Sequence, residues 1–353
     1  MSWNNVKGVS AAQIWTDNPD MTQAYLFANG NHQVKLTIGV SLTLSNAEQP
    51  GPTEDEVRAA LSLIDFETAA DLSFLKTGDK GSYAYVYQPN MPEKIKAIET
   101  TSDSSTYQYE FDYYVSSDDI INANYGSEKV ALLLTYTDAS GNKIEYYTAS
   151  GSKSQSYVAV TVYPPKKYGV AGSSSTPVII NLKDDKPKYE VTSSAQNTDE
   201  IMDSSAETYS MRIDDSYFRI ISFQASADIP SNHPFYIDGS SSGEESVGHY
   251  RYASNEAYIP TDNKLNQGYV SYNTILQFDY NGSGGNLITV SISVTQESNE
   301  LILIKLWGDI LFSNETFSNN HSTALVCVFD QFGNPLNIQI GMTNGEFDIN
   351  SVT

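Results

Sequence analysis

The sequence predicts a mainly β protein made of two antiparallel β-sandwich domains with one short α-helix. Apolar residues recur at every second position in many segments, which is the period of a half-buried strand. Gly, Pro, Asn, Asp and Ser separate these segments at short intervals, as in sandwich proteins. A chain of 353 residues is long enough for two domains of about 150 residues each.

The charge balance excludes several classes of partner. The chain has 20 Lys and Arg against 43 Asp and Glu, which gives a net charge of −23 at pH 7. Such an acidic protein is repelled by phosphate backbones and anionic lipid surfaces. We therefore expect neither a nucleic-acid partner nor insertion into a membrane. A single cysteine also excludes a framework of disulfides within the chain.

The first 30 residues lack the features of a secretory signal. They contain no basic start followed by an apolar run, and no stretch of the chain approaches the roughly 20 apolar residues of a membrane-spanning helix. We expect synthesis in the cytoplasm without a signal peptide. Release or attachment to a cell surface would then follow a leaderless route.

The clearest strand signal covers residues 34–44, where apolar residues alternate with polar residues or glycine. Alternating aromatic residues predict two further strands over 83–87 and 107–113, each with its rings on one face. The remaining expected strands span residues 130–136, 144–148, 157–163, 217–225, 274–280, 287–295, 301–307, 324–329 and 336–340.

One segment favours a helix instead of a strand. Thr53 and Glu56 have the spacing of a capping box, in which each side chain accepts a hydrogen bond from the other residue's backbone. Acidic residues fill the first turn, where the helix dipole favours them, and helix-forming residues follow. The sequence predicts a helix over 54–64.

Composition changes along the chain suggest where the domains begin and end. We expect an N-terminal arm over 1–20, a first sandwich over 21–165, a Pro-, Gly- and Ser-rich linker over 166–207, and a second sandwich over 208–353. The second sandwich is the more acidic, since residues 190–353 hold 5 basic and 21 acidic side chains.

A strand–turn–strand pattern near the end of each half indicates two related domains. Residues 132–144 and 325–336 both contain an apolar strand, the turn Asp-x-x-Gly-Asn, and a second apolar strand. Asp accepts backbone hydrogen bonds in such turns, while Gly and Asn tolerate a positive φ.

This pattern resembles the hairpin of bacterial immunoglobulin-like domains found in adhesins and fibre proteins. Residues 32–65 are also similar to uncharacterised bacterial β-sandwich proteins. The resemblance implies two immunoglobulin-like or related sandwiches of bacterial or phage-like origin with a binding or scaffolding role. It carries no catalytic residue to this chain.

The leading functional prediction is non-enzymatic self-assembly, in which copies of the chain build a homo-oligomer, a filament or an inclusion. The chain has few charged residues (18%), 25 tyrosines and no recognisable nucleophile or cofactor motif. Tyrosine suits interfaces because its ring is apolar and its hydroxyl stays polar. Edge strands and terminal arms join such assemblies through added strands. The predicted assembly arm carries Trp3, Ile14 and Trp15.

The alternative prediction is a carbohydrate-binding or adhesive module, for example as part of a toxin or a fibre. Exposed tyrosines together with Asn and Asp in loops suit the recognition of sugars. The loop over 238–260 is the candidate site because it is rich in Ser, Tyr and His. Its candidate glycan-binding residues are Asp238, His249, Tyr250, Tyr252 and Tyr258.

Calcium is the one cofactor that the residues suggest. Asp214–Asp215 and Glu244–Glu245 are neighbouring carboxylates in predicted loops, and calcium prefers oxygen ligands. The competing interpretation, that these are solvated turn residues, leaves the protein without a cofactor.

Glycoside hydrolysis is the enzymatic alternative. It needs two carboxyl groups about 5–10 Å apart, and Glu110 and Asp112 lie two residues apart on one strand face, which spaces them by about 7 Å. That face is expected to be exposed to solvent, because it lies opposite the aromatic face of the same strand. We therefore expect that the protein is not an enzyme.

Overall fold

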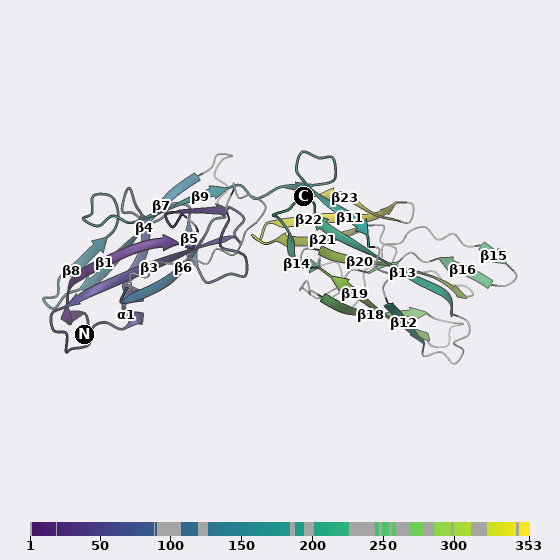
Figure 1. Cartoon of the computed structure of the whole chain (residues 1–353), viewed down its shortest axis with the longest axis horizontal. Coiled ribbons are helices and arrows are strands. Elements are labelled where there is room, and N and C mark those ends of the chain that lie inside the picture. Colours follow the sequence, from purple (N-terminus) through teal and green to yellow (C-terminus); the bar gives the residue numbers. More distant parts are fainter. Residues whose placement is uncertain are drawn as a thin grey trace. The chain divides into compact units, whose positions relative to one another are not determined.

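The computed structural model shows a mainly β protein (Figure 1). It describes residues 2–18, 20–87, 89, 107–118, 126–183, 188–193, 201–225, 244–246, 249–253, 256–258, 268–278, 286–297, 300–311, 323–343 and 346–353. The chain divides into two compact units. The first comprises Met1–Lys166 with Phe332–Asn334, and the second comprises Lys167–Gln331 with Pro335–Thr353.

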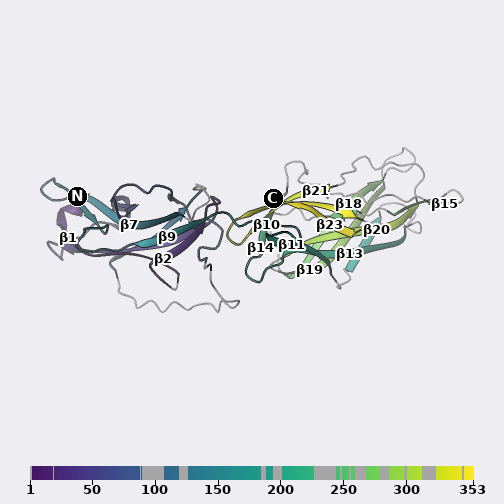
Figure 2. The same ribbon diagram turned by 90° about the horizontal axis from the view of Figure 1, so that it is seen from above.

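The first unit contains two sheets with the strand orders β1-β3-β6-β5 and β2-β9-β7-β4. Neighbouring strands are antiparallel except for β2 and β9, which run parallel side by side (Figure 2). The strands are β1 (Val6–Thr16), β2 (Gln23–Phe27), β3 (Gln33–Leu44), β4 (Leu61–Asp65), β5 (Lys76–Gly78), β6 (Tyr109–Ser116), β7 (Gly126–Thr137), β8 (Lys143–Tyr147), which also pairs with β7, and β9 (Val158–Tyr163).

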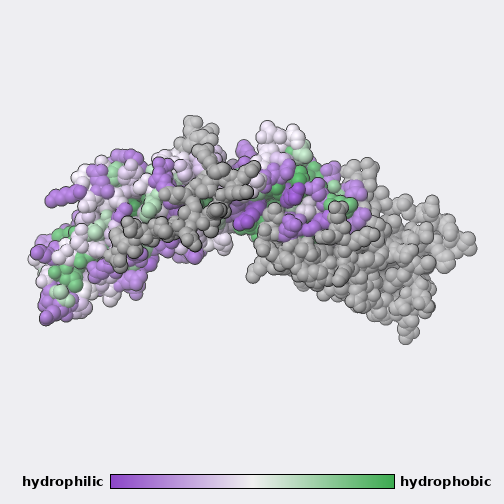
Figure 3. All heavy atoms as spheres, viewed as in Figure 1, coloured by the Kyte–Doolittle hydropathy of each residue, from purple (hydrophilic) through white to green (hydrophobic). Residues whose placement is uncertain are grey.

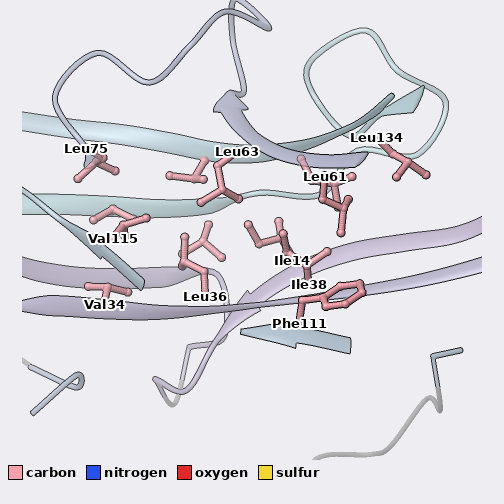
Figure 4. Close-up of a cluster of buried hydrophobic side chains, with 14 of the residues drawn as sticks. Ile14, Val34, Leu36, Ile38, Leu61, Leu63, Leu75, Phe111, Val115 and Leu134 are labelled. Carbon is pink, nitrogen blue, oxygen red and sulfur yellow. The ribbon is translucent and has the colours of Figure 1, made fainter. Parts of the chain in front are cut away.

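The main apolar core of the first unit lies between these two sheets. Leu36 and Ile38 of β3 and Leu132 of β7 are fully buried, and Figure 4 shows side chains from both sheets filling the space between them. This confirms the strand predicted over 34–44 and the sandwich-type packing. The surface of the first unit seen in Figure 3 is mainly hydrophilic with small hydrophobic patches, as expected when the apolar faces are buried.

The predicted helix exists but is shorter than expected. α1 spans Glu54–Ala60, and both hydrogen bonds of the capping box between Thr53 and Glu56 are present. The chain then continues as strand β4 from Leu61. The extension of the helix to residue 64 was wrong because Leu61 and Leu63 alternate into the sandwich core, where they pair with β7.

The predicted N-terminal arm is not a separate arm. Residues 2–5 form the short 3-10 helix η1 (Ser2–Asn5), and β1 pairs with β3 as part of the first sheet. The alternation in β1 is weakened by two register shifts, between Val6 and Gly8 and between Val9 and Ala11. These bulges hid the strand in the sequence.

The strand predicted over 83–87 is also absent, since these residues form a loop. Its tyrosines contact different neighbours instead of lining one strand face: Tyr85 packs on Tyr114, and Tyr87 packs on Phe27. Aromatic alternation alone therefore did not determine a strand here.

The second unit contains three sheets. Their orders are β10-β11-β13-β20-β16-β15 with β17 beside β20, β12-β19-β18, and β14-β21-β22-β23. The strands are β10 (Tyr168–Gly169), β11 (Thr176–Leu182), β12 (Lys188–Ser193), β13 (Ile201–Ile213), β14 (Ile220–Ala225), β15 (Glu244–Ser246), β16 (His249–Ala253), β17 (Glu256–Tyr258), β18 (Gly268–Phe278), β19 (Asn286–Gln296), β20 (Glu300–Leu311), β21 (Thr323–Asp330), β22 (Pro335–Thr343) and β23 (Glu346–Val352).

The segment predicted as a linker over 166–207 instead contains strands of this unit. Val178, Ile179 and Ile180 of β11 pair with β13, and Val178 is buried. The surrounding Ser, Gly and Pro residues suggested a linker, but the short β-branched run between them was the better guide.

The two units share one strand pairing that is followed by a hairpin. In the first, β3 pairs with β6 and the β7–β8 hairpin follows; in the second, β13 pairs with β20 and the β21–β22 hairpin follows. Both predicted Asp-x-x-Gly-Asn turns connect these hairpins, and Gly141 and Gly333 both have a positive φ, of 83° and 73°. The internal repeat seen in the sequence therefore corresponds to the same hairpin position in each unit.

Candidate functional site

The outer face of the β1-β3-β6 sheet combines exposed aromatic and polar side chains. Ile14, Ile38 and Phe111 lie in register and are buried, so the residues next to them along each strand point outward. The outward residues are Gln13 and Trp15 from β1, Lys35, Thr37 and Gly39 from β3, and Glu110, Asp112 and Tyr114 from β6. Together with Tyr85 and Tyr107 from adjoining loops, we call this surface the aromatic face.

A stacked pair of rings lies at one side of the aromatic face. The ring centroids of Trp15 and Tyr107 are 5.6 Å apart, and the ring planes differ by 27°. Tyr107 lies over Gly39, where the absence of a side chain leaves room for its ring. Its hydroxyl donates a hydrogen bond to Oε1 of Gln13 at 2.5 Å. Both rings are partly exposed, so the pair is a fixed aromatic platform within reach of a ligand.

A second pair of rings, Tyr85 and Tyr114, lies farther along the same face. Their centroids are 5.2 Å apart. Gln33 holds the loop that carries Tyr85, because its side chain donates to the carbonyl of Asp79 and accepts from the amide of Gly81. The Tyr85 hydroxyl in turn donates to the carbonyl of Gly81 at 2.8 Å.

The two aromatic pairs are too far apart to bind the same small group. Trp15 and Tyr114 stand on strands β1 and β6, which are two ladder spacings, or about 10 Å, apart across the sheet. They are also offset by one side-chain repeat, about 7 Å, along the strands. A ligand that touches both pairs must be longer than one sugar ring.

Charged side chains lie between these pairs. Nζ of Lys35 is 3.3 Å from the carboxylate of Asp17 and 3.4 Å from that of Asp112. Partial burial opposes the charge on Lys35, but these two carboxylates outweigh it and raise its pKa above the ordinary value. Asp112 also accepts a hydrogen bond from the Thr37 hydroxyl at 3.0 Å. Lys35, the cation of the aromatic face as defined above, is therefore already neutralised.

Glu110 differs from the other two carboxylates. It is exposed and lies opposite Gly39 in the ladder, beside the position that Tyr107 covers. Among the residues that the structure describes, it has no ion-pair or hydrogen-bond partner. It is thus a carboxylate available to a ligand at the edge of the Trp15–Tyr107 platform.

The predicted spacing of Glu110 and Asp112 on one outward face agrees with the structure, and both side chains are exposed. Glycoside hydrolysis requires one carboxyl group in an environment that keeps it protonated. Asp112 instead contacts Lys35, and Glu110 faces solvent. This geometry suits the binding of a ligand better than acid catalysis.

The three residues of the predicted assembly arm occupy different environments. Trp3 stacks on Tyr136 with ring centroids 4.8 Å apart, and Ile14 is buried in the core. Trp15 alone of the three faces outward on the sheet. The prediction that a free arm presents Trp3 and Ile14 was thus wrong, because both side chains pack within the first sandwich.

Of the calcium candidates, only Asp214 and Asp215 lie where the structure describes side chains. Asp214 and Asp215 are exposed, and Asp215 accepts hydrogen bonds from the amides of Tyr217 and Phe218, which is ordinary turn chemistry. Glu244 and Glu245 lie in β15 rather than in a loop. In the part of the chain that the structure describes, no group of three or more His, Cys, Asp and Glu side chains is arranged to hold a metal ion.

The glycan candidates of the second half are described only in their backbone. Asp238 lies outside the described residues, His249, Tyr250 and Tyr252 are in β16, and Tyr258 is in β17. Strands β16 and β17 both pair with β20, so residues 238–260 do not form one continuous loop.

Sequence reasoning missed the relationship between Gly39 and Tyr107. We placed Tyr107 on the same face as Tyr109 and Phe111, but β6 begins at Tyr109 and Tyr107 lies on the opposite face. A signal was present, since a glycine inside a strand often marks a close approach by another group.

No protein-family model matches the chain, and no curated protein sequence matches it either. Among the described residues, no helix is both long and apolar enough to cross a membrane.

Proposed function

We propose that the protein is a non-enzymatic carbohydrate-binding protein that binds an extended glycan on the aromatic face of its first unit. The observation that carries this proposal is the Trp15–Tyr107 platform, held above Gly39 on the outer face of the β1-β3-β6 sheet. Sugars offer apolar C–H faces that pack on aromatic rings and hydroxyl groups that bond to polar side chains. The aromatic face offers both kinds of partner.

The strand order of the first unit supports an immunoglobulin-type sandwich. β1-β3-β6-β5 opposite β9-β7-β4 is the ABED and CFG arrangement of immunoglobulin constant-type domains, with β2 as an additional strand beside β9. We propose that the first unit is an immunoglobulin-type sandwich. Such folds host many functions, so the functional argument depends on the aromatic face and not on the fold.

The second aromatic pair favours a chain of sugars over a single sugar. A glycan lying across the sheet would meet Trp15 and Tyr107 first, then the exposed carboxylate of Asp112, then Tyr114. Rigid aromatic side chains lose little conformational entropy on binding, which makes them effective anchors.

Binding of the full chain to a panel of neutral and amine-bearing oligosaccharides tests this proposal. We expect micromolar to millimolar affinity for at least one glycan. W15A should weaken it by about 2 kcal/mol, roughly thirtyfold in Kd, as for other aromatic anchors.

Tyr147 provides a matched control because it is an aromatic residue, 39% exposed, on β8 of the other sheet. Y147A should leave glycan binding unchanged. The absence of binding to the whole panel, or equal losses in W15A and Y147A, would contradict the proposed function.

A further inference from the structure

The charge on the aromatic face suggests which glycans it selects. Three carboxylates lie at this face, those of Asp17, Glu110 and Asp112. Lys35 is the one cation of the face as defined above, and it pairs with both Asp17 and Asp112. An acidic glycan would meet repulsion here, both from the face and from a chain of net charge −23. The favoured ligand is therefore neutral or cationic.

Glu110 favours a cationic ligand over a neutral one. Cross-strand neighbours have Cβ atoms about 5 Å apart, so the Glu110 side chain begins beside the position over Gly39 that Tyr107 occupies. A cation placed beside this ring would contact the Glu110 carboxylate and the Tyr107 ring together. Both interactions favour an ammonium group, and neither favours an acetylated nitrogen.

Resting on the proposed function, we propose that the aromatic face selects glycans with free amino groups, and that Glu110 is the residue that determines this selectivity. Tyr107 and Trp15 hold the sugar ring by stacking. Glu110 pairs with a protonated amine on that ring or on its neighbour. Asp112 does not take this role because Lys35 and Thr37 already contact its carboxylate.

The test compares a glucosamine oligomer with its fully N-acetylated counterpart by isothermal titration calorimetry on the full chain. At about pH 6 the amines of the glucosamine oligomer are protonated. The free-amine oligomer should bind about five- to tenfold more tightly, as expected for an exposed ion pair reinforced by a cation–π contact. E110Q should remove this preference while leaving the affinity for the acetylated oligomer unchanged.

Glu145 supplies a control away from the aromatic face, since it is an exposed glutamate that pairs with Lys143 on a strand of the other sheet. E145Q should retain the preference for the free amine. Equal binding of both oligomers by the unmodified protein would overturn the selectivity and leave glycan binding intact. Binding of neither oligomer would also overturn the selectivity, whereas only the absence of binding to the whole panel would overturn the proposed function.

Two further outcomes would contradict the inference alone. A preference that survives in E110Q would show that Glu110 does not determine it. Equal affinity for a lysine peptide of the same length and charge would show that the face recognises ammonium groups in general and does not select a glycan.

Discussion

The ring of Tyr107 lies directly on the backbone of Gly39. A Cβ at residue 39 would be 2.4 Å from both Cγ and Cδ2 of this ring. Cγ is attached close to the Tyr107 backbone, so the ring cannot turn aside cheaply. G39A should therefore displace Tyr107, break its hydrogen bond to Gln13 and reduce glycan affinity about as much as Y107A does.

Gly8 offers a control for this substitution. It also lies in a strand of this sheet, but a methyl group added to it would have no atom within 4 Å. G8A should keep full glycan affinity, as measured by calorimetry. If G39A bound glycan as well as G8A does, the platform over Gly39 would not be the binding surface.

His32 should make the stability of the first unit depend on pH. Its side chain is fully buried, Nδ1 accepts the amide hydrogen of Phe27 at 2.9 Å, and Nε2 has no hydrogen-bond partner among the described residues. Burial lowers the pKa of His32 to about 3. Between that value and about pH 6.5 the unfolded chain binds a proton that the folded chain does not, so stability falls as the pH falls.

The expected contribution is about 1.4 kcal/mol for each pH unit in this range. Urea denaturation of the full chain at about pH 7.5, 6 and 5 measures it. The H32N side chain keeps a hydrogen-bond acceptor near the position of Nδ1 and does not titrate. The variant should be less stable overall, but its free energy of unfolding should no longer carry the His32 contribution to the pH dependence. An unchanged slope in H32N would refute the assignment to His32.

The capping box predicts a modest effect on stability. Thr53 accepts a hydrogen bond from the Glu56 amide, and the Glu56 carboxylate accepts one from the Thr53 amide at 2.8 Å. T53A should destabilise the first unit by about 1 kcal/mol, whereas T53D should retain most of the stability because Asp also caps helices. Thermal denaturation compares the three proteins; equal losses in T53A and T53D would argue against capping.

A buried ion pair should couple two residues of the second unit. Nζ of Lys183 lies 2.5 Å from the carboxylate of Glu300, whose side chain is 5% exposed and also accepts from Ser210 and from the Glu297 amide. Removing the cation leaves a buried carboxylate without its counter-charge, so K183M should cost about 3 kcal/mol.

Adding E300Q to K183M should recover part of this loss, because the remaining amide is neutral. Urea denaturation of both single variants and the double variant gives the coupling energy. If the effects of the two substitutions simply added, the residues would act independently and the ion pair would not contribute as described.

Local patterns predicted much of the fold. The 34–44 strand, the capping box and the two hairpins each depend on neighbours in the sequence, and each is present. β1 and β11 were missed because the strand pattern of each is short or interrupted. Bulges interrupt β1, and a short apolar run within turn-forming residues conceals β11.

The candidate site was harder to predict than the fold. Glu110, Asp112 and Trp15 were all considered, but for different roles, since only the register of β1, β3 and β6 shows that they share one face. Self-assembly through copies of the chain stays a prediction. Its proposed arm is not free but forms β1, the edge strand of its sheet, so any assembly through it would add a strand to that edge.

Fluorine NMR of protein labelled with 5-fluorotryptophan tests glycan binding on the aromatic face most directly. The chain has three tryptophans, Trp3, Trp15 and Trp307, and single Trp→Phe variants assign their signals. On titration with a glycan that binds, only the Trp15 signal should shift. A shift of Trp3 or Trp307 with an unmoved Trp15 would place the ligand elsewhere and contradict the account.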